Sequence, residues 1–242
     1  MPFLAKVTDV PIVQLATRVM LGQSLASQGY RTGLCPTKPL VAIKGPVFSM
    51  SKLVGVDTYL GPEMKSTGEI MGIDREYGPA LAKALLAARS QLPPDGSILL
   101  SIADKDKPEA IPLIQRLARL GYRLYATEGT AAMIQQLGLP VQMITKKLNE
   151  GHPNVVDVIR QGLVDGVVNT VTGRRTPLKD GFYIRRAATE RGIPCFTSLD
   201  TFRAAVEALA HNGSSYSVLP LDAYLVGSDE PATVGGDGGS RR

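Results

Sequence analysis

Short apolar runs alternate with amphipathic stretches from residue 97 onward. The runs predict β-strands, and they fall at 98–102, 123–126, 141–144, 166–169 and 194–196. The stretches between and after them predict helices because their apolar residues recur at helical spacing, at 108–120, 130–136, 153–161, 180–191 and 198–210. Strands and helices that alternate in this way are typical of an α/β fold with a doubly wound, parallel, five-stranded sheet.

The first 96 residues follow a different pattern. Apolar positions predict one helix over about 10–28 and a strand at 40–44, followed by a turn-rich stretch. One helix and a strand or two cannot enclose a hydrophobic core, so we expect residues 1–75 to be an incomplete α+β unit that packs on other parts. Residues 76–96 predict a linking helix over 80–92 that ends in a proline- and glycine-containing turn.

The remaining residues complete the expected domain organisation. Residues 97–226 form the predicted α/β domain, and the glycine-rich tail at 227–242 is expected to be disordered. The chain has 242 residues, 44% of them hydrophobic and 20% charged, which is ordinary for a globular protein. No apolar run reaches the roughly 18 residues of a membrane span, and the N-terminus lacks a secretory signal pattern, so a cytoplasmic location is expected.

Cysteine and histidine are too scarce to indicate a metal site. Cys35 and Cys195 are far apart and have no partner at metal or redox spacing, so both are expected to be ordinary reduced thiols. With only His152 and His211 in addition, a zinc site is not expected.

Positive charge is concentrated in one window of the predicted α/β domain. Residues 146–191 hold nine Lys or Arg and five Asp or Glu, so this window carries +4 of the net charge of +5. Such a surface suits a nucleic acid or a small phosphorylated ligand. The chain has no Trp, and no aromatic side chains are interleaved with the basic ones, which weakens the case for nucleic acid.

Polar and basic residues follow several of the predicted strands, where ligands of such sheets bind. Residues 127–130 hold two threonines and a glycine before a helix N-terminus, a combination that suits a phosphate group. Lys107 follows the first strand, Lys146 and Lys147 follow the third, and residues 169–175 supply amide, hydroxyl and guanidinium donors after the fourth. Each segment has a simpler explanation as a helix start, solvated surface or contact with an acidic partner. Their convergence on one sheet edge nevertheless favours a phosphate site.

Catalytic residues are not expected. A general base beside the phosphate site would be a carboxylate or a histidine, and the candidates are Glu128, Glu150, His152 and Asp157. Residues 150–154 are explained most simply as a turn and a helix cap. No Ser–His–Asp arrangement, metal cluster or Walker loop is present.

A long motif at residues 60–72 resembles a known family. It matches the pattern L-G-P-E-M-x-S-T-G-E-x-M-G of carbamoyl-phosphate synthetase large chains. Residues 2–6 resemble the P-F-x-x-K segment of that family's second ATP-grasp unit, and residues 55–57 also fit. Residues 126–130, Lys147 with residues 149–151, and residues 169–175 resemble its C-terminal effector domain. The resemblance covers about residues 2–210.

The resemblance implies a fold, a reaction and a ligand. The family makes carbamoyl phosphate from bicarbonate, glutamine-derived ammonia and two ATP, for arginine and pyrimidine synthesis. Its C-terminal domain has the methylglyoxal synthase-like fold and binds nucleotide effectors such as UMP or IMP. Carried over by position, the effector phosphate would be held by Lys107, Thr127, Gly129, Thr130 and Lys147. The base and ribose would be held by Ser101, Asn169, Thr170, Thr172 and Arg174. A threonine of the family falls on Val171, so its contact is expected to be lost or passed to Thr172.

The same resemblance implies partners and limits. The partners would be a nucleotide effector, the remainder of the large chain and the glutaminase small chain, with no nucleic acid and no membrane. The family's ATP-grasp metal ligands lie just upstream of P-F-x-x-K and are not in this chain. No cofactor is therefore expected in this piece, whereas the complete synthetase would need ATP with Mg or Mn. Lys44 is followed by Gly45 where ornithine-activated members have Glu, so ornithine activation is not expected.

Three functional hypotheses follow. The first is a regulatory and interface segment of a synthetase, present as a split subunit, a truncated gene product or an engineered fragment. The second is a free-standing lyase that acts on dihydroxyacetone phosphate, although no glycine-rich loop carries an acid where methylglyoxal synthases keep their catalytic aspartate. The third, a nucleic-acid binder, depends on the basic charge alone.

Overall fold

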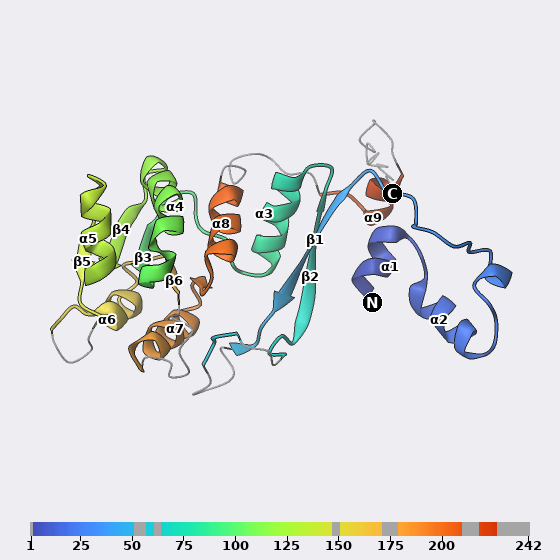
Figure 1. Ribbon diagram of the computed structural model, residues 1–242, viewed down its shortest axis with the longest axis horizontal. Coiled ribbons are helices and arrows are strands. Elements are labelled where there is room, and N and C mark those ends of the chain that lie inside the picture. The colour runs from blue at the N-terminus through green and yellow to red at the C-terminus, as the bar shows by residue number, and fades with distance from the viewer. Residues whose placement is uncertain are drawn as a thin grey trace, which may run out of the picture.

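The computed structural model describes residues 2–50, 57–60, 64–146, 151–170, 179–209 and 218–226. Its elements follow one another along a long axis (Figure 1). An α/β unit lies at one end, and helices α1 (Pro2–Thr8) and α2 (Ile12–Met20) lie at the other. Between them lie the strands β1 (Val41–Val47) and β2 (Gly68–Asp74) with helix α3 (Tyr77–Ala87).

The α/β unit contains the expected parallel sheet. Its strands pair in the order β5-β4-β3-β6-β7, and every pairing is parallel. The bounds are close to those predicted: β3 (Ser97–Ser101), β4 (Arg123–Thr127), β5 (Gln142–Ile144), β6 (Gly166–Asn169) and β7 (Cys195–Phe196). The predicted doubly wound, five-stranded sheet is therefore confirmed.

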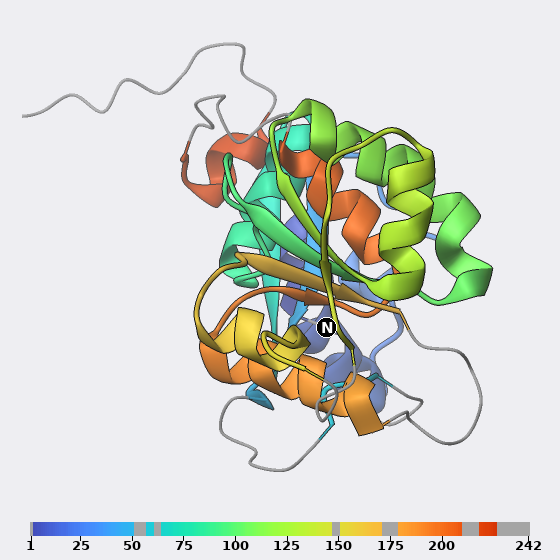
Figure 2. The same ribbon diagram turned by 90° about the vertical axis from the view of Figure 1, so that its left-hand side faces the viewer.

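Helices cover both faces of this sheet (Figure 2). On one face lie α4 (Lys107–Arg119), α5 (Glu128–Gln136) and α8 (Leu199–Leu209), whose side chains Leu113, Ile134 and Phe202 belong to one buried cluster. On the other face lie α6 (Val155–Arg160) and α7 (Lys179–Arg191), whose Val155, Ile159 and Ile184 belong to a second cluster. The chain winds from β3 to β5 on the first face and returns through β6 to β7 on the second. This reversal is what right-handed crossovers require when the direction of winding changes.

The N-terminal part differs from its prediction. The helix expected over about 10–28 ends at Met20, and a short 3₁₀ helix η1 (Ala26–Gln28) follows. Gly22 adopts a φ of 94°, which interrupts the helix because residues in this conformation cannot continue it. Helix α1 and strand β2 were not expected, and β1 extends to Val47 rather than ending at residue 44.

The two strands β1 and β2 form an antiparallel ribbon covered by α3. Gly45 pairs with Ile70, and Gly72 pairs with Ile43. A Cβ atom at Gly72 would lie 2.2 Å from the carbonyl oxygen of Ala80, so only glycine allows β2 to approach α3 this closely. The predicted linking helix is thus a packing element, and it also contacts α8 of the α/β unit.

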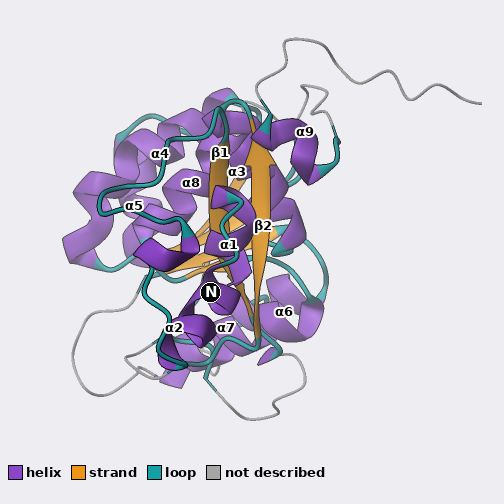
Figure 3. Ribbon diagram, turned by 90° about the vertical axis from the view of Figure 1, so that its right-hand side faces the viewer, coloured by secondary structure: helices purple, strands orange, loops and turns teal. Residues whose placement is uncertain are grey.

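Near its C-terminal end, the described chain returns to the N-terminal part. Helix α8 was expected to be the last, but α9 (Leu221–Leu225) follows and contacts α1. Figure 3 shows α9 near the end of the β1–β2 ribbon, on the side where α1 and α2 lie. The predicted disordered tail at 227–242 lies outside the described residues. Neither cysteine is in a disulfide, and none of the described helices is both long and apolar enough to cross a bilayer.

Candidate functional site

The carboxyl ends of β3 and β6 mark the point where the sheet changes its direction of winding. These strands are neighbours, but the helices that follow them, α4 and α7, cover opposite faces. Ligands of open α/β sheets bind in the crevice that such a reversal leaves. Ser101 and Asn169 pair directly in the register at this edge, and both are buried.

The segment after β3 is held by two threonines from neighbouring elements. The hydroxyl oxygen of Thr130 accepts a hydrogen bond from the amide of Ile102 at 3.1 Å. The hydroxyl oxygen of Thr170 accepts one from the amide of Ala103 at 2.8 Å. Both threonines are buried, so they shape this rim of the crevice. Because the Thr170 oxygen acts as the acceptor in this contact, its hydroxyl proton can be donated to another group.

Lys107 lies against the first turn of α5. A Cβ atom built on Gly129 would lie 3.2 Å from the Nζ atom of Lys107, so the ammonium group occupies the space that the glycine leaves open. Thr127 caps α5 in extended conformation, and its side chain makes no cap hydrogen bond. The free amides of the helix start and the lysine charge therefore face the same place, which suits an anion.

The cation at this position already has a carboxylate partner. The Oδ1 atom of Asp104 lies 2.6 Å from the Nζ atom of Lys107, and the Asp104 side chain is 93% exposed. The hydrogen bond from Lys107 holds the pKa of Asp104 below its ordinary value of 3.8. Because the carboxylate is solvated, it can swing away and release the ammonium group to a ligand.

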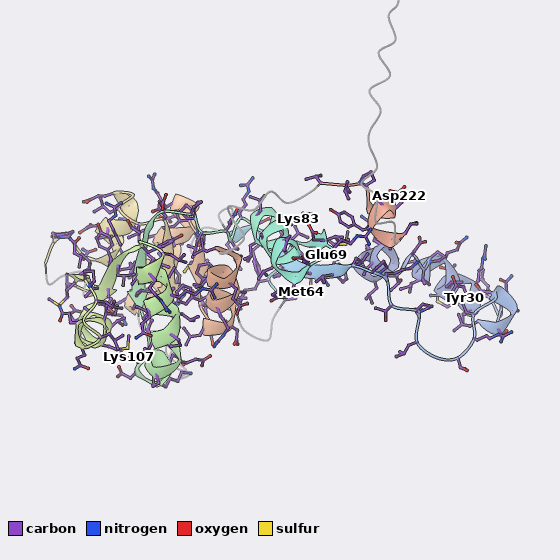
Figure 4. The ribbon with its side chains drawn as sticks, turned by 90° about the horizontal axis from the view of Figure 1, so that it is seen from above. Tyr30, Met64, Glu69, Lys83, Lys107 and Asp222 are labelled. Carbon is purple, nitrogen blue, oxygen red and sulfur yellow. The ribbon has the colours of Figure 1, made fainter. Side chains whose placement is uncertain are left out.

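The structure brings together the predicted site residues that it describes. Those at the carboxyl edge of the sheet are Ser101, Lys107, Thr127, Gly129, Thr130, Asn169 and Thr170. Lys147, Thr172 and Arg174 lie outside the described residues. The amide of Lys146 donates to Glu128 at 3.2 Å, which draws the end of β5 toward the start of α5. Figure 4 labels Lys107 in the α/β unit, far along the axis from Tyr30.

Three of the four candidate general bases make structural contacts, namely Glu128, His152 and Asp157. Asn154 caps α6 and forms a capping box with Asp157, as the predicted turn and cap implied. The hydrogen bond from the amide of Asn154 and the contact with His152 lower the pKa of Asp157. Glu128 accepts from Lys146, and Glu150 lies outside the described residues. Within the described part of the chain, no three His, Cys, Asp or Glu side chains are grouped as for a metal ion.

One residue at the carboxyl edge of the sheet was not predicted from the sequence. Arg185 on α7 has a relative exposure of only 1%, and its Nη1 atom donates to Oδ1 of Asn169 at 2.8 Å. Its Nε and Nη2 atoms donate to the two carboxylate oxygens of Asp57 at 2.8 and 2.5 Å. Arg185 counted only as one charge of the basic window, because its partner is 128 residues away in the sequence. Nothing in the sequence near Arg185 or near Asp57 indicates that the two residues pair.

Part of the α/β unit matches a known domain family. A family model described as an MGS-like domain matches residues 109–197. The chain is 56% identical over 223 residues to a carbamoyl phosphate synthase large chain from Thermomicrobium roseum. That alignment covers 92% of this chain and 21% of the relative, so the chain spans about a fifth of the length of the relative it matches.

Two solved structures are also similar to the chain. A methylglyoxal synthase from Elizabethkingia anophelis NUHP1 has 19% identity and a TM-score of 0.40, covering 59% of this chain and 97% of that one. The protein ForH has 21% identity and a TM-score of 0.35, covering 53% of this chain and 87% of that one.

Proposed function

We propose that this chain, which corresponds to the C-terminal part of a carbamoyl phosphate synthase large chain and contains an MGS-like domain, is its regulatory segment. It would bind the phosphate of a nucleotide of the UMP or IMP type at the carboxyl edge of its parallel sheet. The complete synthetase would make carbamoyl phosphate from bicarbonate, glutamine-derived ammonia and two ATP with Mg or Mn, for pyrimidine and arginine synthesis.

One observation supports the phosphate site above all others. The Lys107 ammonium group lies 3.2 Å from the place that a Cβ of Gly129 would take, against the first turn of a nine-residue helix. A phosphate there would receive the lysine charge and the free amides of the helix start together. The basic window at 146–191 adds a net charge of +4 from the same unit.

The N-terminal part supports the idea of a segment that works within a larger assembly. In helix α2 and its C-cap residue, Val13, Met20 and Leu21 are exposed by 58%, 79% and 79%, which is unusual for apolar side chains so close together. An exposed apolar face of this kind fits packing against the remainder of the large chain. Under this proposal the glutaminase small chain is a further partner of the assembled enzyme.

Isothermal calorimetry with UMP and IMP tests the binding proposal. We expect saturable heat with wild-type protein, and an affinity about 10- to 100-fold weaker for Lys107→Gln because a charge-assisted hydrogen bond is lost. Lys105→Gln is the matched control, since it removes an equal charge from η3 (Asp104–Asp106) beside the site. Absence of heat at millimolar nucleotide, with the protein shown to be folded, would reject the proposal.

The MGS-like domain also favours a second candidate, a lyase that converts dihydroxyacetone phosphate to methylglyoxal. This reaction needs a base beside the phosphate site. Asp157 completes the capping box of α6, and Asp104 is 93% exposed and paired with Lys107, so neither is placed in a shielded catalytic pocket. We expect no methylglyoxal from dihydroxyacetone phosphate. Turnover that Asp104→Asn abolishes would establish the lyase instead.

A further inference from the structure

Arg185 is a buried cation that joins two distant parts of the chain. It lies on α7 of the α/β unit with a relative exposure of 1%. Its guanidinium group binds both carboxylate oxygens of Asp57, which belongs to the N-terminal part, and the side-chain oxygen of Asn169 at the end of β6. A buried charge must be paired to be tolerated, so these contacts are tightly constrained.

The contact with Arg185 determines which way the Asn169 amide faces. A guanidinium group can only donate hydrogen bonds, so the oxygen of Asn169 must face Arg185 and its NH₂ group must face away. Among the described residues, no acceptor is recorded for that NH₂ group. Asn169 therefore offers donors at the sheet edge, and a ligand group that binds there must be an acceptor, such as a carbonyl or ribose oxygen.

The packing around Arg185 leaves little room for another arrangement. A Cβ atom on Gly181 would lie 2.9 Å from Nη1 of Arg185 and 3.4 Å from Oδ1 of Asn169. The ring of Tyr59 also lies close, with its centroid 5.9 Å from the guanidinium carbon. The Arg185 side chain therefore cannot follow a displaced Asn169 without disturbing its contacts with Asp57 and Tyr59.

We infer that Arg185 is a positioning residue that couples ligand contact at Asn169 to the segment 57–60 of the N-terminal part. This inference depends on the proposed nucleotide site. When an acceptor of the ligand binds the Asn169 amide, the hydrogen bond between Asn169 and Arg185 changes. The contacts that Arg185 makes with Asp57 and Tyr59 then change as well. By thermodynamic linkage, the factor by which the ligand changes the strength of the Arg185–Asp57 pair equals the factor by which the pair changes the affinity for the ligand. Breaking the pair must therefore change that affinity.

A single-tryptophan reporter can test this coupling, because the chain contains no Trp. Tyr59 is 41% exposed, so Tyr59→Trp places an indole beside Arg185 without overfilling a core. We expect the tryptophan emission to change during titration with UMP or IMP, with the midpoint that calorimetry gives for the same protein. Asp57→Asn in this background should abolish the emission change and weaken binding about fivefold or more.

Glu190→Gln is the matched control for Asp57→Asn. Glu190 is exposed and pairs at 2.8 Å with Arg186, the residue that follows Arg185 on α7. The substitution therefore removes a carboxylate from a neighbouring arginine that is not part of the proposed coupling. It should change neither emission nor affinity. Calorimetric binding without any emission change, or an unchanged affinity in Asp57→Asn, would overturn the coupling and leave the nucleotide site intact. Absence of calorimetric heat would instead reject the nucleotide site, and the coupling with it.

Discussion

Arg75, the residue after β2, donates a hydrogen bond to the backbone carbonyl of Tyr224, 149 residues further along the chain, at 3.0 Å. The same guanidinium group donates to the carbonyls of Ala223 and Val226, and so satisfies the C-terminal end of α9. It also lies 5.7 Å from the centroid of the Tyr224 ring. This arginine therefore fastens the end of the described chain to the N-terminal part.

Removal of the Arg75 side chain should release α9. We expect Arg75→Ala to speed proteolytic cleavage near residues 221–226 several-fold. Because Arg75 is exposed, the global free energy of unfolding should fall by only roughly 1 kcal/mol. Limited proteolysis with mass spectrometry measures the first effect, and urea denaturation measures the second. Arg203→Ala is a suitable control, since Arg203 forms an exposed ion pair with Glu109 elsewhere. Equal cleavage rates in both variants would contradict the fastening role.

Gly72 should tolerate no side chain. Alanine at this position would bring a methyl group to 2.2 Å from the carbonyl oxygen of Ala80, so β2 and α3 would have to separate. We expect Gly72→Ala to lower the free energy of unfolding by about 1–3 kcal/mol or more, as measured by urea denaturation. Gly68→Ala on the same strand is the control, because its new Cβ would meet Val47 at 4.0 Å. Similar losses in the two variants would show that close packing is not the reason for glycine at position 72.

Asp104 should compete with a phosphate ligand for Lys107. Replacement by asparagine frees the ammonium group, so we expect Asp104→Asn to bind the nucleotide more tightly. An exposed ion pair is weak, so the gain should not exceed about fivefold, and it should shrink at high salt. Calorimetry at two ionic strengths measures both effects. Asp106→Asn removes an equal charge from η3 and controls for the general field. Weaker binding by Asp104→Asn would mean that the carboxylate helps the site.

The Arg185–Asp57 pair should make stability depend on pH in the acid range. Burial raises the pKa of Asp57, but the hydrogen bond and charge of Arg185 outweigh this effect, and the pKa lies below its ordinary value of 3.8. A carboxyl with a lowered pKa stabilises the fold above about pH 4, and this stabilisation is lost as the pH falls through the folded-state value. The free energies of unfolding of wild type and Asp57→Asn should thus differ at pH 6 and converge toward pH 3. A difference that stays constant would contradict the paired carboxylate.

The α/β unit could be predicted because its signals are local. Each strand is a short apolar run, each helix has its own periodicity, and α6 also has the capping box of Asn154. Strand β2 was missed because Gly68–Asp74 follows a turn-rich motif and owes its conformation to pairing with β1. The rim residues at the ends of β3, β4 and β6 could be placed from topology alone. Arg185 could not, since its role depends on a partner far away in the sequence and on the space at Gly181.

The central position of β3 has a consequence for the order in which the protein folds. One half of the sheet, from β3 to β5, comes from the continuous segment 97–144, so its contacts are short in sequence and should form early. The other half forms only when β6 pairs with the free edge of β3, and α7 can pack on the sheet only after that. The pairing of Arg185 with Asp57 spans 128 residues and should form after both halves of the sheet. Completion of this pair would then mark the moment at which the two parts of the chain act as one body.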